Sequence, residues 1–217
     1  MALFSHILFD MDGTLINSKP GIYHSLQYVL TKMSLPIQAE SIVDAIIGPP
    51  IEEGLKNYLN LTDREAGLAV QIFREYYADR GIYDAELYPG LEDCLSGLND
   101  MGKRLYVATS KNERFLNPVL EYFDIAVYFT DTIGSWGNGT PTKAELITAL
   151  MDRNQLHPSD GVVMVGDTHF DLTGARSNEI DSVAVGYGFG DKDRLMSHKP
   201  TFFAEDVADL YEILMQE

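Results

Sequence analysis

Apolar stretches of strand length alternate with amphipathic stretches of helical spacing over most of this chain of 217 residues, and this alternation constrains the fold most. Strands are expected at 3–9, 104–108, 126–130, 161–165 and 182–185. Helices are expected within 88–102, ending at Gly102, and at 113–122, 143–154, 171–178 and 206–215. Strands that alternate with helices favour right-handed crossovers and a parallel sheet. The sequence therefore predicts an α/β fold with a Rossmann-like parallel-sheet core.

A block without strand signals interrupts this alternation after the first strand. From Pro20 the apolar residues fall at helical spacing, as in Ile22, Leu26 and Val29. The stretches 42–48, 50–60 and 62–81 have helical apolar spacing too. We therefore predict two domains, a core of residues 1–15 and 86–217 and an inserted all-helical cap of residues 16–85.

Two carboxylates, Asp10 and Asp12, stand one residue apart at the end of the first apolar run, in the stretch ILFDMDGTL. Close negative charges repel and raise each other's pKa. The pair is unfavourable unless a metal ion lies between the charges or a reaction uses the two carboxylates in different roles. The alternatives are a plain turn and a calcium loop, but the twelfth position of such a loop is Gly21 rather than glutamate.

Further polar side chains follow the predicted strands at 104–108 and 161–165, and one lysine begins a predicted helix after a glycine-rich loop. They are Thr109, Ser110, Lys111, Lys143, Asp167 and Asp171. Because sites in open parallel sheets form beyond the carboxyl ends of the strands, we expect these groups to converge at one edge.

This set of groups suits phosphoryl transfer. Asp10, Asp167 and the backbone carbonyl of Asp12 offer the hard oxygen ligands that Mg²⁺ prefers. A carboxylate oxygen of Asp10 can attack phosphorus, while Asp12 can protonate the leaving oxygen and later activate water. Thr109 and Lys143 can bind the phosphoryl oxygens and stabilise the developing charge.

The same residues resemble the four motifs of the haloacid dehalogenase-like hydrolase superfamily. FDMDGTL, Thr109 within VATSK, Lys143 and GDTHFD match these motifs in order. The resemblance implies that Asp10 is the nucleophile and Asp12 the general acid and base, with Mg²⁺ on Asp10, the Asp12 carbonyl and Asp167.

Further residues receive roles beside these. The resemblance implies that Asp171 supports the metal or the lysine of the third motif, and we place it with the metal-binding residues. It also implies that Ser110 helps to hold phosphate, and Thr14 of the first motif joins the predicted substrate-binding residues. From the cap, Lys19 and the turn at Gly48 are expected to contact the leaving group.

The cap segments, including IIGPPIEEGL, look like those of phosphoglycolate phosphatases, although Ala-Glu-Leu follows Lys143 where many of these carry Pro-x-Pro, and Ser110 stands where asparagine is frequent. The expected activity is Mg²⁺-dependent hydrolysis of small phosphomonoesters through an aspartyl phosphate, with phosphoglycolate as one substrate. The alternatives are a 5'-nucleotidase, an inorganic pyrophosphatase, a sugar-phosphate mutase similar to β-phosphoglucomutase, and a phosphate-binding module without turnover.

The net charge and the cysteine content indicate which partners and which location to expect. The net charge of −17 disfavours nucleic acid and anionic membranes, so the expected partner is a small phosphorylated metabolite. The single cysteine, Cys94, permits no internal disulfide and fits a cytoplasmic location. We expect no signal peptide and no membrane span, and a monomer or homodimer.

Overall fold

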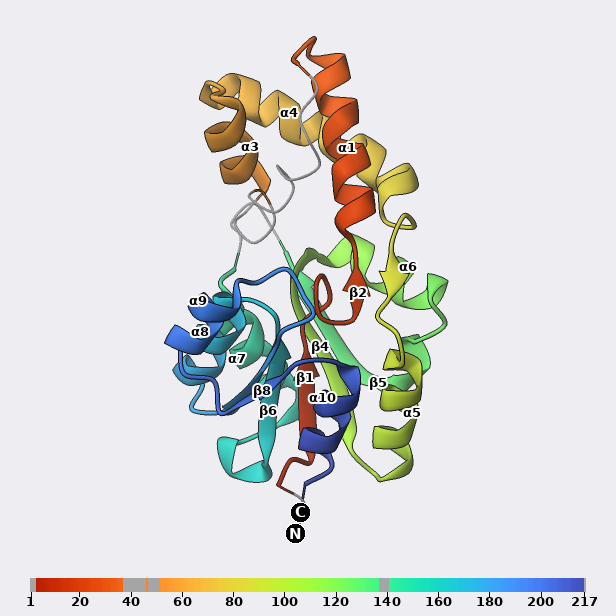
Figure 1. The fold of residues 1–217 in the computed structure, drawn as a ribbon, viewed down its shortest axis with the longest axis vertical. Coiled ribbons are helices and arrows are strands. Elements are labelled where there is room, and N and C mark those ends of the chain that lie inside the picture. The colour runs from red at the N-terminus through yellow and green to blue at the C-terminus, as the bar shows by residue number, and fades with distance from the viewer. Residues whose placement is uncertain (1–2, 37–45, 47–50, 137–140, 217) are drawn as a thin grey trace. The chain divides into compact units, whose positions relative to one another are not determined.

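The computed structural model describes residues 3–36, 46, 51–136 and 141–216. The chain divides into two compact units (Figure 1). The first combines Met1–Asn17 with Leu87–Glu217, and the second comprises Ser18–Glu86. Gly48 lies outside the described residues, so its contact with substrate stays a prediction.

The described part of the first unit contains a six-stranded sheet in the order β5-β4-β1-β6-β7-β8 (Figure 1). Every neighbouring pair of strands is parallel. The register pairs Phe9 with Val107 on one side and with Val165 on the other, so β1 and its two neighbours reach the same edge. The strands are β1 (His6–Phe9), β4 (Arg104–Asn112), β5 (Phe129–Ser135), β6 (Val162–Gly166), β7 (Asp181–Val185) and β8 (Phe202–Ala204). The predicted α/β fold with a parallel sheet is confirmed.

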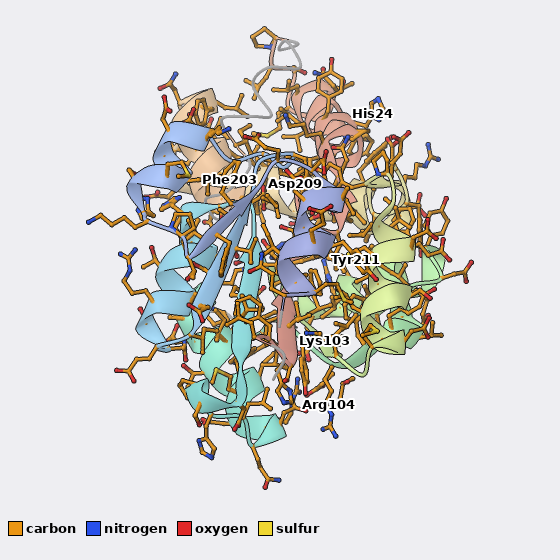
Figure 2. The ribbon with its side chains drawn as sticks, turned by 60° about the horizontal axis from the view of Figure 1, so that its bottom comes forward. His24, Lys103, Arg104, Phe203, Asp209 and Tyr211 are labelled. Atoms are coloured by element: carbon orange, nitrogen blue, oxygen red, sulfur yellow. The ribbon has the colours of Figure 1, made fainter. Side chains whose placement is uncertain are left out.

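Helices cover this sheet and bury its apolar residues. Leu146 and Ile147 of α7 belong to one buried cluster with Leu8 of β1. On α10, Tyr211 packs so closely on α5 that a Cβ at Gly97 would lie 2.8 Å from the Tyr211 hydroxyl oxygen (Figure 2). The helices are α5 (Leu91–Asp100), α6 (Glu113–Tyr122), α7 (Lys143–Asn154), α8 (His169–Ser177), α9 (Lys192–Ser197) and α10 (Val207–Leu214).

The described part of the second unit is helical. It contains α1 (Lys19–Lys32), α3 (Ile51–Leu59), α4 (Asp63–Tyr76) and one π-helical turn, η1 (Tyr77–Gly81). Thr62 and Glu65 form a reciprocal capping box that begins α4. A Cβ at Gly21 would lie 1.9 Å from the carbonyl oxygen of Gly81, so glycine is what lets α1 contact η1. That this unit acts as a cap stays a prediction.

Several short elements differ from the prediction. Ala126–Tyr128 forms a 3₁₀ turn, η2, and β5 begins only at Phe129; Val127 is 82% exposed, which a buried strand would not allow. The strands β2 (Ile16–Asn17) and β3 (Glu86–Leu87) form a separate two-stranded sheet where the chain passes between the units. Neither β8 nor α9 was predicted, because three and six residues are too few to establish a periodicity.

Candidate active site

A tight loop at the end of β1 presents the first two carboxylates. The Asp10 N–H donates to the Val165 carbonyl at 2.9 Å, which extends the β1–β6 pairing by one residue. Gly13 then adopts a φ of +86°, in the left-handed region that favours glycine. The N–H groups of Thr14 and Leu15 both donate to the carbonyl of Met11, which closes the loop. The side chains of Asp10 and Asp12 therefore start from a fixed backbone.

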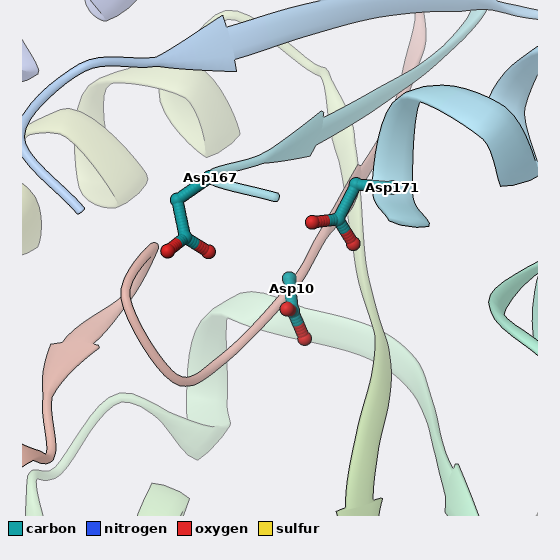
Figure 3. Close-up of side chains that lie close together, drawn as sticks. All are labelled: Asp10, Asp167 and Asp171. Atoms are coloured by element: carbon teal, nitrogen blue, oxygen red, sulfur yellow. The ribbon is translucent and has the colours of Figure 1, made fainter. Parts of the chain in front are cut away.

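Three buried aspartates meet at this edge of the sheet. Asp10 follows β1, Asp167 follows β6, and Asp171 lies in the first turn of α8 (Figure 3). One carboxylate oxygen from each lies within 4.8 Å of the others. Burial raises the pKa of Asp10 to about 6, with Lys143 opposing this rise and Asp171 adding to it. Burial, and then the charges of Asp171 and Asp10, raise the pKa of Asp167 well above its ordinary value.

Lys143 is the cation of this cluster. It is the first residue of α7, which Thr142 and Glu145 start with a capping box. Its Nζ lies 2.8 Å from Asp10 Oδ1 and 2.9 Å from Asp171 Oδ1, and it donates to the Ala108 carbonyl at 3.0 Å. Burial lowers the pKa of Lys143, but the two carboxylates raise it by more, so the amine stays protonated.

Asp167 is enclosed by its neighbours. The Phe189 N–H donates to its Oδ2 at 2.8 Å and the Thr14 hydroxyl to its Oδ1 at 3.2 Å. A Cβ at Gly13 would lie 2.2 Å from Asp167 Oδ2, and one at Gly188 would lie 2.3 Å from Asp167 Cβ. Glycine at both positions therefore lets the backbone close around this carboxylate. We predicted that Thr14 binds substrate; in the structure its hydroxyl supports Asp167.

The segment 186–190, which follows β7, was not recognised from the sequence as part of the site. Its available signal was GYGFG, with three glycines in five residues after a predicted strand. Besides the Phe189 N–H, this segment supplies Tyr187, whose hydroxyl donates to the carbonyl of Thr14 at 3.2 Å. The ring of Tyr187 packs on Tyr88 at a centroid distance of 4.6 Å. The segment thus supports both Asp167 and the loop after β1.

The two carboxylate oxygens of Asp171 have different partners. Its Oδ2 accepts hydrogen bonds from the Thr168 N–H at 3.0 Å and the Thr168 hydroxyl at 2.7 Å, which completes the capping box of α8. Its Oδ1 is buried and, within the described part of the chain, accepts no hydrogen bond of good geometry, although Lys143 Nζ lies 2.9 Å away. A buried carboxylate oxygen whose contact is an ammonium group lies in a site suited to cations.

The remaining predicted residues lie as follows. Thr109 is buried in the second half of β4, and burial raises the pKa of Asp10 despite a hydrogen bond from the Thr109 hydroxyl that opposes this rise. Ser110 beside it is exposed. The carboxylate of Asp12 lies against Lys111, whose Nζ is 2.9 Å from Oδ1 and 2.8 Å from Oδ2. Lys19 begins α1 in the second unit, and its contact with substrate stays a prediction.

The charges of these groups do not balance. The four aspartates carry −4 when ionised, and Lys111 and Lys143 supply +2, which leaves −2. Oxygen ligands with this surplus suit a divalent cation such as Mg²⁺. Burial raises the pKa values of Asp10 and Asp167 most, and the neighbouring carboxylates add to this rise.

No helix in the described ranges is long and apolar enough to cross a membrane.

Comparison with known proteins agrees with the site. Residues 7–185 match the family described as haloacid dehalogenase-like hydrolase. The chain is 34% identical to the 5'-nucleotidase of Pseudomonas aeruginosa, over 97% of this chain and 96% of that protein. It is 28% identical to the phosphoglycolate phosphatase of Vibrio vulnificus, over 96% of this chain and 95% of that protein.

Two further similarities define how far the fold is shared. The haloacid dehalogenase-like family hydrolase of Streptococcus pneumoniae has a solved structure with a TM-score of 0.91 and 30% identity, covering 98% of this chain and 99% of that one. The tyrosine-protein kinase PtkA of Mycobacterium tuberculosis is 34% identical over 86% of this chain, which spans 64% of that protein. With the matched family, the phosphatase relatives and the cluster of aspartates around Lys143, the chain belongs to the haloacid dehalogenase-like hydrolase family and is a phosphoric monoester hydrolase related to the phosphoglycolate phosphatases.

Proposed function

We propose that this protein is a Mg²⁺-dependent phosphatase that hydrolyses small phosphomonoesters through a phosphoaspartyl intermediate at Asp10. The observation that carries the proposal is the environment of this one carboxylate. Asp10 Oδ1 accepts the Met11 N–H at 2.8 Å and lies 2.8 Å from Lys143 Nζ, while Asp167 and Asp171 complete a buried acidic cluster. A fixed carboxylate beside a cation suits nucleophilic attack on phosphorus.

In the first step Asp10 Oδ2 forms a bond to phosphorus as the bond from phosphorus to the ester oxygen breaks. Asp12 gives its proton to that leaving oxygen. In the second step Asp12 takes a proton from water as the water attacks phosphorus, which releases inorganic phosphate and restores Asp10. Thr109 and Lys143 bind phosphoryl oxygens and stabilise the charge on them.

Asp10, Asp167 and the carbonyl of Asp12 would hold Mg²⁺, with Asp171 supporting the metal or Lys143. The bound cation supplies positive charge that offsets the acidic cluster and the phosphate. The fit rests on the buried Asp171 Oδ1 and on the surplus of carboxylates over lysines at this site.

Two substrate classes are supported by relatives. The 5'-nucleotidase of Pseudomonas aeruginosa, at 34% identity, supports a nucleoside 5'-monophosphate. The phosphoglycolate phosphatase of Vibrio vulnificus, at 28% identity, supports phosphoglycolate. We propose that the protein acts in the cytoplasm, where both classes of metabolite occur. We propose further that it is a monomer or homodimer.

The test measures phosphate release with Mg²⁺ from adenosine 5'-monophosphate, phosphoglycolate, glucose 6-phosphate, pyrophosphate and p-nitrophenyl phosphate. We expect release from at least one ester, none after EDTA, recovery with Mg²⁺, and none from a folded Asp10→Asn variant. Release by Asp10→Asn at the wild-type rate, or release that ignores EDTA, would contradict the mechanism. Transfer to a second hydroxyl without free phosphate would indicate a mutase.

A further inference from the structure

The site holds a second buried lysine that the proposed mechanism does not use. Lys111 lies near the carboxyl end of β4, and its side chain is only 4% exposed. Its Nζ lies 2.9 Å from Oδ1 and 2.8 Å from Oδ2 of Asp12, so it contacts both oxygens of one carboxylate. Lysine is rarely buried to this degree without a partner. This ammonium group is therefore matched to Asp12.

The local backbone directs Lys111 to this position. The Thr109 hydroxyl accepts the Lys111 N–H at 3.2 Å, and the pairing of β4 with β5 shifts register between Ala108 and Asn112. A Cβ at Gly134 of β5 would lie 2.8 Å from the carbonyl oxygen of Lys111. Glycine at position 134 thus allows the bent end of β4 to approach β5. The conformation that places Thr109 by Asp10 also fixes the start of the Lys111 side chain.

The two lysines of the site divide the carboxylates between them. Lys143 pairs with Asp10 and Asp171, which are members of the acidic cluster. Lys111 pairs with Asp12, whose side chain remains 24% exposed. A carboxylate that is held from one side and open on the other is suited to meet a substrate oxygen.

We propose that Lys111 is a positioning residue that holds the Asp12 carboxylate for proton transfer to the leaving oxygen. The proposal rests on the function proposed above. When Asp12 gives up its proton to that oxygen, it becomes an anion. The contacts of Lys111 with both oxygens hold this carboxylate in one orientation toward the leaving oxygen, and such orientation lowers the barrier of the first step. Lys111 therefore acts through Asp12 rather than on phosphorus.

This role has a specific kinetic consequence. A proton donor matters most for a poor leaving group and least for one that departs readily as an anion. Lys111→Met should therefore damage hydrolysis of phenyl phosphate more than that of p-nitrophenyl phosphate, which differs by one nitro group. The quantity to compare is kcat/KM, because it covers the chemistry up to formation of the phosphoaspartate and excludes the later hydrolysis that both substrates share.

We expect Lys111→Met to lower kcat/KM for phenyl phosphate about 10-fold more than for p-nitrophenyl phosphate, which is a fraction of the roughly 10²–10⁴-fold that general acid catalysis contributes. Asp12→Asn should show the same selective loss, and adding Lys111→Met to it should not increase the selectivity. Lys111→Arg should restore part of the loss.

Lys103→Met is the matched control. Lys103 is also buried, lies at the amino end of β4 next to Arg104 (Figure 2), and donates to the Phe4 carbonyl at 2.6 Å. Its loss should change kcat/KM for the two esters by the same factor.

Equal losses for both esters in folded Lys111→Met would overturn the positioning role and leave the phosphatase proposal intact. If wild type releases phosphate from none of the esters named here and in the test of the proposed function, that function fails and the role of Lys111 fails with it. Thermal melting of each variant separates a loss of fold from a loss of proton transfer.

Discussion

Replacing Gly188 with alanine tests whether the segment after β7 holds Asp167 in place. Gly188 has no positive φ that would itself exclude a side chain. The difficulty is space, since the added Cβ would lie 2.3 Å from both Asp167 Cβ and the carbonyl oxygen of Gly13. Ordinary contacts begin at 3.4 Å, so these atoms must separate by about 1.1 Å (3.4 − 2.3).

Neither Asp167 nor the carbonyl group of Gly13 can easily move away from the added Cβ. Gly13 O belongs to the loop that carries Asp10 and Asp12, and Asp167 is held by the Phe189 N–H and the Thr14 hydroxyl. We therefore expect the carboxylate itself to shift by about 1 Å, which at a reacting centre lowers the rate by roughly 10²-fold. Overpacking should lower the free energy of unfolding by about 1–3 kcal/mol.

The assay measures kcat/KM for p-nitrophenyl phosphate over a series of Mg²⁺ concentrations. We expect Gly188→Ala to need more Mg²⁺ for half-maximal rate and to remain slower at saturation. The control is Gly67→Ala on the exposed face of α4, where, apart from the adjacent residues and the backbone of the helix itself, no described atom lies within 4 Å of the added Cβ. It should keep wild-type kinetics and stabilise the helix by about 0.5–1 kcal/mol. A folded Gly188→Ala protein with wild-type rate and Mg²⁺ dependence would refute the argument.

Three further predictions concern Lys143, Asp10 and the capping box of α4. Lys143→Met should lower the free energy of unfolding of the metal-free protein by about 3–5 kcal/mol in urea titration, because it leaves Asp10 and Asp171 buried without their cation; an equally stable variant would show that this pair is not desolvated as described. Because the pKa of Asp10 is raised from 3.8 to about 6, the folded metal-free protein binds a proton in this window that the unfolded chain does not. The free energy of unfolding of the wild-type protein should therefore rise, relative to that of Asp10→Asn, by up to about 3 kcal/mol as the pH falls from 7 to 4. Identical pH profiles for the two proteins would contradict this prediction. Thr62→Ala should remove the capping box of α4 and lower the melting temperature by an amount equivalent to about 1 kcal/mol, with unchanged kcat/KM for p-nitrophenyl phosphate as the second readout.

The sequence predicted the main elements of the fold where local signals were strong. The expected helices at 113–122 and 143–154 coincide with α6 and α7, whose first residues follow the capping side chains of Asn112 and Thr142. The strands at 104–108 and 161–165 were recognised from their apolar runs, although β4 continues to Asn112. The elements that the sequence missed, among them β2, β3, β8 and α9, are short and depend on neighbours for their definition.

The candidate site, too, was predicted from the sequence only in part. That Asp10, Asp167, Asp171 and Lys143 converge follows from where the strands end, which is a property of any parallel sheet. The contact of Lys111 with Asp12, and the enclosure of Asp167 by glycines, depend on side-chain reach and on backbone approaches between segments far apart in the chain. No local pattern encodes these distances, so only the folded structure reveals them.

The charge of the site also limits the order in which ligands enter. With all of them ionised, the four aspartates and two lysines carry a net charge of −2, and a phosphate dianion adds −2 more. At about 5 Å and an effective dielectric constant of about 20, each pair of unit charges interacts by roughly 3.3 kcal/mol, so the four repulsive pairs oppose binding by about 13 kcal/mol. A divalent cation cancels the surplus charge of the protein and removes this repulsion. In a chain whose net charge is already −17, we therefore expect a divalent cation to bind before phosphate or together with it, and phosphate binding measured by calorimetry without Mg²⁺ should be undetectable.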